Sequence, residues 1–162
     1  MLKRTTHWAT REFHQFLLER EKLPFAWGTN DCCLFPADAI QSFTGEDLAA
    51  EFRGKYTDEA SAFAVVRDVC SSLAPNDWQV TQRNVAYIAA SWCAKKAGLV
   101  EWVDKEDKPA PLFAQRGDLV VVENGESVIA GVVHLNGRHV ISVGHEGLLR
   151  LPMRAVKRAW RI

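Results

Sequence analysis

The chain has 162 residues, of which 48% are hydrophobic and 25% are charged, as in an ordinary soluble globular protein. We expect one domain spanning residues 1–162, because a domain commonly contains about 100–200 residues. A chain of this length buries enough surface to fold without a disulfide or a metal ion. Lysine plus arginine and aspartate plus glutamate each number 20, and no run approaches the ~18 apolar residues of a membrane span. Neither nucleic acid nor a membrane span is therefore expected.

The N-terminal segment, MLKRTTHWATREF, lacks the apolar stretch of a secretion signal. We therefore expect the protein to remain in the cytoplasm where it is made, or to leave the cell by lysis or inside an assembly. Near the C-terminus, basic residues outnumber a single acid, Glu146. Either a polyanion-binding edge or solvated strand ends would explain this basic group, which comprises Arg138, Arg150, Arg154, Lys157, Arg158 and Arg161.

Helical patterns occupy the first part of the chain. Apolar residues at three-to-four spacing, helix-capping residues and glycine stops predict helices at residues 9–21, 32–43, 57–73 and 86–97. Pro36 places the start of the second helix. Proline has no amide hydrogen and clashes with the carbonyl four residues earlier, so it fits only the first helical turn. The second helix must therefore begin near Cys32 or Cys33.

After Gly117 the pattern changes to alternation and short β-branched runs. The turn signals Asn124-Gly125, Asn136-Gly137 and Gly144-His145 help to separate five predicted strands, at residues 118–123, 127–134, 138–143, 147–152 and 155–162. Helices followed by a small sheet indicate an α+β fold. We expect the N-terminal helices to pack on a C-terminal five-stranded antiparallel sheet.

The four cysteines, Cys32, Cys33, Cys70 and Cys93, show neither a CxxC spacing nor the density of a disulfide framework. We expect reduced thiols and neither a metal nor a cofactor. Adjacent cysteines cannot easily face one metal ion, and the other two lie in apolar helical stretches.

Two aspartates are expected to have structural roles. Asp38 should face solvent or cap a neighbouring loop. Asp118 begins a strand after a glycine and should hold that turn by accepting hydrogen bonds from backbone amides.

Cys32 is the candidate nucleophile. At a helix start its sulfur would lie beside unpaired backbone N–H groups and the positive end of the helix dipole. Both favour thiolate over thiol, the form in which cysteine attacks. We expect Asp31 to orient this helix start. The alternative for Cys32 is a small buried residue without a chemical role.

The segment PFAWGTNDCCLF resembles the signature of the NlpC/P60 family, papain-like peptidases in which a glycine-containing loop leads to Asp-Cys-Ser-Gly-Phe and a helix. Cys33 and Leu34 replace the serine and glycine, and the matching positions are Trp27, Gly28, Asp31, Cys32 and Phe35. RGDLVVV is similar to the family's Gly-Asp-Leu-Val strand. Together with WGTNDC, the ending GLLRLPMRAVKRAWRI resembles a phage and prophage subfamily often encoded among tail-tip genes. The resemblance covers residues 7–53 and 114–162.

The resemblance implies a peptidase that cuts cell-wall peptides with a Cys–His pair and a third polar residue. The family's histidine falls on Ile129 here, and the third polar residue falls on Ile141. Both partners of the cysteine are therefore replaced, and isoleucine can neither accept nor donate a proton.

His139 is the candidate substitute for the missing histidine. If the Asn136-Gly137 turn is the three-residue kind, His139 shares a face with Ile129 and Ile141 and lies about 7 Å from the Ile141 position. With a two-residue turn, His139 and His134 become cross-strand neighbours instead. His145 lies in a turn, where solvent exposure is expected.

Two functions follow from these residues. The first is a structural or assembly protein of a phage tail tip, which keeps the peptidase fold and has lost the chemistry. Its partners would be tail-tip or baseplate proteins, and it would reside in the virion tail after synthesis in the host bacterial cytoplasm. The second is an active cell-wall cysteine peptidase or amidase, which uses Cys32 and a displaced His139 on peptidoglycan peptides. Ile129 and Ile141 favour the first function, and the retained Asp31-Cys32 pair favours the second.

Overall fold

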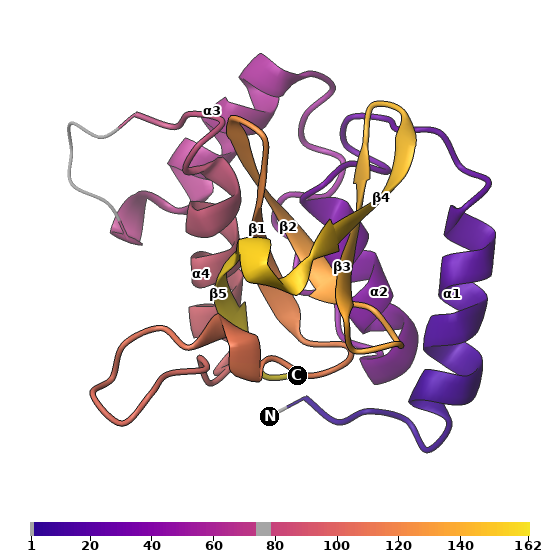
Figure 1. The fold of residues 1–162 in the computed structure, drawn as a ribbon. Helices are drawn as coiled ribbons and strands as arrows, with labels where there is room; N and C mark the ends of the chain where they lie inside the picture. Colours follow the sequence, from indigo (N-terminus) through magenta and orange to yellow (C-terminus); the bar gives the residue numbers. More distant parts are fainter. Residues whose placement is uncertain (1, 74–78) are drawn as a thin grey trace.

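Helices precede a five-stranded antiparallel sheet in the computed structural model, which describes residues 2–73 and 79–162 (Figure 1). The α-helices of these residues are α1 (Phe13–Arg20), α2 (Leu34–Thr44), α3 (Glu59–Val69) and α4 (Val85–Ala97). The strands are β1 (Leu119–Asn124), β2 (Ser127–Val133), β3 (His139–Gly144), β4 (Gly147–Pro152) and β5 (Val156–Trp160). The predicted α+β class and the predicted antiparallel sheet are confirmed.

Local signals account for the helix ends. Asp58 caps α3, because its carboxylate accepts a hydrogen bond from the backbone N–H of Ser61 at 2.7 Å. The Ser61 hydroxyl in turn accepts one from the backbone N–H of Asp58 at 3.2 Å. Gly45 and Gly98 end α2 and α4 in the left-handed conformation that glycine adopts without strain.

Two predicted helices contain turns that are not α-helical. A π-helical turn, Trp8–Glu12, leads into α1, and a 3₁₀ turn, Ser71–Leu73, follows α3. The predicted ranges 9–21 and 57–73 therefore cover the right segments but merge two kinds of helical turn. Apolar spacing alone does not separate turns that differ only in hydrogen-bond pattern.

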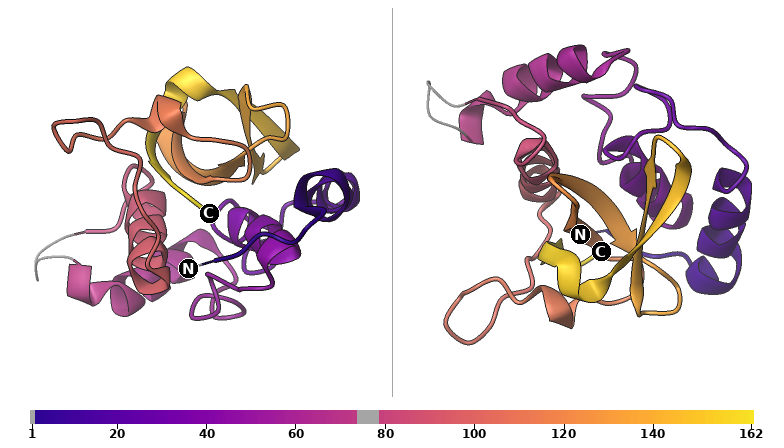
Figure 2. Two further views of the ribbon diagram at one scale, coloured as in Figure 1. Left: turned by 90° about the horizontal axis from the view of Figure 1, so that it is seen from below. Right: turned by 45° about the horizontal axis from the view of Figure 1, so that its top comes forward.

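The strands run as successive hairpins until β5, which returns beside β1, so the order across the sheet is β4-β3-β2-β1-β5. The sheet curls, and the helices gather on one side of it (Figure 2). Two apolar clusters result. One lies between the sheet and the helices and includes Val121, Val132 and Ile141. The other lies on the opposite face and includes Val122 and Ile129.

The β2–β3 connection corrects the predicted placement of the two isoleucines. The backbone N–H of His134 donates to the carbonyl of His139 at 2.8 Å, so the connection is longer than either turn considered above. Ile141 consequently faces the helices, whereas Ile129 belongs to the cluster on the other face. The expectation that Ile129, His139 and Ile141 share one face is wrong, because a one-residue change in register moves side chains to the other face. His134 and His139 are cross-strand neighbours, as the alternative turn predicted.

Asp118 has the predicted structural role. Its side chain is only 2% exposed and accepts a hydrogen bond from the backbone N–H of Gln115 at 2.8 Å. The Trp102 indole N–H and the Arg4 guanidinium also donate to it, at 2.8 and 3.0 Å. Asp118 therefore joins the strand start to the N-terminal segment.

The first of the two expectations for Asp38, that it faces solvent, is wrong. Asp38 is buried rather than exposed, and it forms ion pairs with Arg20 and with Arg53. Arg20 comes from α1, and Arg53 comes from the segment after α2. The packing of these two segments buries the Asp38 carboxylate, which would otherwise face solvent. Two cations offset the cost of burying this one charge.

Candidate functional site

Asp31 organises the turn that begins α2. Its side chain is fully buried, and its Oδ1 accepts hydrogen bonds from the backbone N–H groups of Cys33 at 3.0 Å and Leu34 at 2.9 Å. Its Oδ2 accepts from the Gly28 N–H at 2.8 Å and from the Tyr56 hydroxyl at 2.7 Å. The carboxylate thus satisfies helix-start amides that have no partner within the helix. The predicted helix start near Cys32 or Cys33 is confirmed, because α2 begins at Leu34 with Cys33 as its N-cap.

Gly28 and Tyr56 complete the support of this turn. Gly28 has φ of +82°, and a Cβ placed there would lie 2.2 Å from the Tyr56 carbonyl oxygen, so no other residue fits. Burial raises the pKa of Tyr56 well above its usual range, and the nearby Cys33 and Asp31 raise it further. Tyr56 therefore stays neutral and donates its hydrogen bond to Asp31 at any physiological pH.

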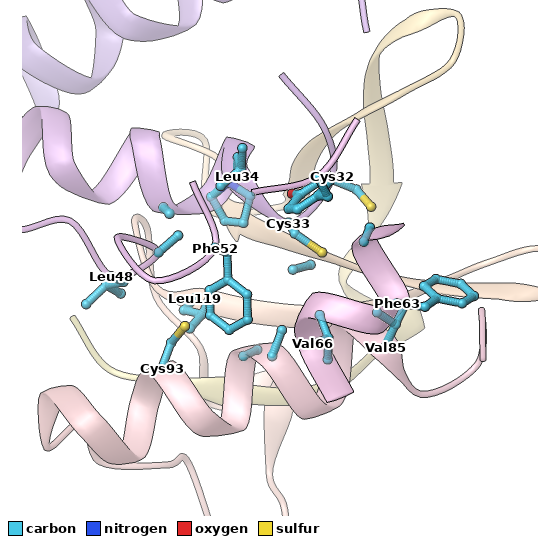
Figure 3. A pocket seen from close by; sticks show the side chains of 18 of the residues that line it. Cys32, Cys33, Leu34, Leu48, Phe52, Phe63, Val66, Val85, Cys93 and Leu119 are labelled. Carbon is cyan, nitrogen blue, oxygen red and sulfur yellow. The ribbon is translucent and has the colours of Figure 1, made fainter. Parts of the chain in front are cut away.

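The two adjacent cysteines face different spaces. Figure 3 shows the Cys33 sulfur directed into a pocket between α2, α3 and α4, with the Cys32 sulfur pointing toward the pocket's edge. The Cys33 space is a small apolar cavity of about 60 Å³, lined by residues that include Phe52, Val66 and Cys93. Cys32 also lines a second space, an open cleft of about 310 Å³.

The cleft lies where several segments meet the sheet. Its apolar floor consists of Val85, Val128 and Ile129, each only 8% exposed. Aromatic and polar side chains surround that floor. They come from the loop before α2, from α3, from the loop before α4 and from two hairpin turns, and they include Phe25, Trp27, Phe63, Glu59, Gln82, Asn124, Ser127, His145 and Glu146.

The structure brings His145, and not His139, to the cleft of Cys32. The His145 ring packs on Phe25 with ring centroids 4.4 Å apart and lies 6.1 Å from the Trp27 ring. His139 begins β3, whose other end reaches this cleft at Gly144, roughly 16 Å further along the strand. His139 Nδ1 instead lies 3.0 Å from the Asn136 side-chain amide.

Cys32 has no histidine hydrogen-bonded to it within residues 2–73 and 79–162. The neighbour of its sulfur is the Cys33 thiol, and the hydrogen bond between them, together with burial, raises the pKa of Cys33 well above its ordinary value. Ile129 lines the same cleft as Cys32, so an apolar side chain faces this space beside the thiol. The arrangement offers a reachable thiol beside an apolar floor, without a base bonded to it.

Sequence reasoning missed the other polar residues of the cleft. His145 is exposed, as expected for a turn, yet it lines the same cleft as Cys32. No local pattern relates the β3–β4 turn to residue 32, because more than a hundred residues separate them along the chain. The packing of the β3–β4 turn against Phe25 and Trp27 of the loop before α2 creates this proximity.

The described residues give little support to a metal site, a membrane-spanning helix or a polyanion-binding edge. No three of their His, Cys, Asp or Glu side chains gather closely enough to hold a metal ion. None of the helices in this part of the chain is long and apolar enough to cross a membrane. Two members of the basic C-terminal group are paired with acids: Arg158 with Glu101, and Lys157 with Glu123.

A family profile described as "Domain of unknown function (DUF6950)" matches residues 3–162. No curated protein and no solved structure matches the chain. The profile spans the helices, the sheet and the Cys32 cleft together, so these features form one family unit.

Proposed function

The chain belongs to the DUF6950 family, and we propose that it is a structural or assembly protein of a phage tail tip with a catalytically degenerate NlpC/P60-like fold. It would bind tail-tip or baseplate proteins and reside in the virion tail. Helices packed on an antiparallel sheet, with a cysteine at the start of a helix beside that sheet, support the NlpC/P60-like part of this proposal.

The observation that carries the loss of catalysis is Ile129 in the cleft of Cys32. Peptide cleavage by a cysteine needs a base that takes the thiol proton and returns a proton to the leaving amine, a contribution worth about 10²–10⁴-fold in rate. Ile129 performs neither step, because its side chain is apolar, and it is 8% exposed within an apolar cluster.

The tail-tip part of the proposal rests on the sequence. WGTNDC and GLLRLPMRAVKRAWRI are similar to a phage and prophage subfamily often encoded among tail-tip genes. In the structure, these motifs form the turn before α2 and the segment from β4 to the C-terminus. Both contribute to the folded body, so a protein that has lost its chemistry still has reason to retain them.

The first test measures hydrolysis of purified peptidoglycan peptides by mass spectrometry. We expect the protein to release no more product than its Cys32→Ala variant. In parallel, purified phage particles should contain the protein at a fixed, low copy number. Turnover that depends on Cys32 would overturn the degenerate assignment, and absence from particles and from tail assembly intermediates would overturn the structural one.

A second candidate function is favoured by one observation, that His145 lines the cleft of Cys32. Movement of the β3–β4 turn would let this imidazole act as the displaced base of a cell-wall peptidase or amidase. That function predicts peptide turnover that disappears in Cys32→Ala and His145→Ala and persists in His139→Ala. Equal activity of the His145 and His139 variants would exclude His145 as the base.

A further inference from the structure

The cleft beside Cys32 is acidic although the chain as a whole has no net charge. Glu59 and Glu146 line it, whereas no lysine or arginine does. Neither carboxylate forms an ion pair within the part of the chain that the structure describes. The Gln82 side-chain amide donates to both oxygens of the Glu59 carboxylate at a long 3.4 Å. The cleft therefore presents uncompensated negative charge to whatever enters it.

Charge and apolar surface are separated by depth in this cleft. Glu146 is exposed and Glu59 is half-buried, so the carboxylates lie at the rim. Val85, Val128 and Ile129 are nearly covered and form the floor. A ligand that fits must therefore carry its positive charge near the entrance and an apolar group at the other end.

We propose that this cleft binds the free amino terminus of a peptide whose first side chain is apolar. The terminal ammonium lies between Glu59 and Glu146, beside the aromatic rings of Phe25 and Trp27, whose faces attract cations. The first side chain packs on Val128 and Ile129. The inference rests on the proposed function, because a cleft without a base holds a peptide rather than cleaving it.

The dimensions of the cleft favour a chain end over other cationic ligands. Its volume of about 310 Å³ is at the lower limit of ligand pockets, which suits one or two residues and not a folded surface. A lysine side chain entering this cleft would place its ammonium at the apolar floor, where an unpaired charge is costly. An amino terminus keeps its charge at the rim, with the side chain below it.

The test titrates the protein with the tripeptide amide Leu-Gly-Gly-NH₂ and, separately, with its N-acetylated form, and follows binding by NMR chemical shifts. We expect the free-amine peptide to bind, and the acetylated peptide to bind at least about tenfold more weakly because it carries no charge. The affinity of the free-amine peptide should fall as salt is added. Equal affinity of the two peptides, or binding of neither, would overturn the inference.

Single charge-removing variants locate the site. We expect Glu59→Gln and Glu146→Gln each to weaken binding of the free-amine peptide by about threefold, as for other exposed ion pairs. Glu46→Gln is the matched control, since Glu46 is an exposed acid beyond the C-terminal end of α2 and outside the cleft, and it should bind as the wild type does. Unchanged binding in both cleft variants would place the peptide elsewhere.

The same samples separate the two proposals. Mass spectrometry after each titration shows whether the peptide has been cut. Cleavage that requires Cys32 would overturn the proposed loss of catalysis and leave the amino-terminus site standing. Intact peptide without detectable binding would overturn only the site.

Discussion

Cys32 and Cys33 are neighbours in the chain, yet they serve two regions of contrasting character. Cys33 faces a small apolar cavity of about 60 Å³ between the helices, and Cys32 lines both the edge of this cavity and a larger cleft of about 310 Å³ with a polar rim. The Asp31 carboxylate holds the turn from which both side chains leave. The comparison teaches that the space a side chain enters, rather than its local sequence, decides whether a thiol is available for chemistry.

Alkylation kinetics test this contrast most strongly. Near pH 7, we expect a small alkylating reagent to label Cys32 much faster than Cys70 or Cys93, because burial raises the pKa of these two thiols to about 12 and leaves little thiolate. Cys33, whose pKa is also raised, should remain unlabelled. Peptide mapping by mass spectrometry gives each rate. Comparable rates at Cys32 and Cys33 would show that the two spaces are not distinct.

Removing the carboxylate of Asp31 should destabilise the turn that directs Cys32 and Cys33 into different spaces. We expect Asp31→Ala to lower the free energy of unfolding by about 3 kcal/mol, because it leaves four buried donors without their acceptor. Urea denaturation measures this change. Asp31→Asn is the control: it keeps one acceptor oxygen and should lose about half as much. Asp31→Ala should also expose Cys33 to alkylation, and a stable variant with an unreactive Cys33 would contradict the role assigned to this carboxylate.

Alkaline pH should lower the stability of the fold through the buried thiols of Cys70 and Cys93. The folded pKa values of Cys70 and Cys93 are raised to about 12, so the stability they provide is complete below the unfolded thiol pKa of about 9 and is lost as pH rises toward 12. As the pH rises from about 8 to about 10, ionisation of each thiol on unfolding should lower the free energy of unfolding by about 1 kcal/mol.

Two variants check the origin of that loss. Cys93→Ala should reduce the decline between about pH 8 and pH 10 by about 1 kcal/mol, because one buried thiol no longer ionises on unfolding. Val66→Ala, which shortens an apolar side chain of the same cavity and removes no thiol, should leave the decline unchanged. Denaturation curves at the two pH values provide the measurement. Equal effects of the two variants on the decline would show that it does not come from ionisation of the buried thiol.

The sequence by itself determined the elements and the start of α2. Pro36 restricted that start to the residues near Cys32, Asp58 and the helix-ending glycines marked helix ends, and alternation with Asn-Gly turns separated the strands. These features were predictable because each depends on backbone geometry and hydrogen bonds within a few residues.

Tertiary structure alone decided what surrounds the candidate nucleophile. The length of the β2–β3 connection put Ile129 and Ile141 on opposite faces, and the β3–β4 turn brought His145 rather than His139 to the cleft. Asp38 became buried because Arg20 and Arg53 reach it from other segments. Each of these outcomes depends on contacts between residues far apart in the chain, and a change of one residue in register is enough to move a side chain from one face of the sheet to the other.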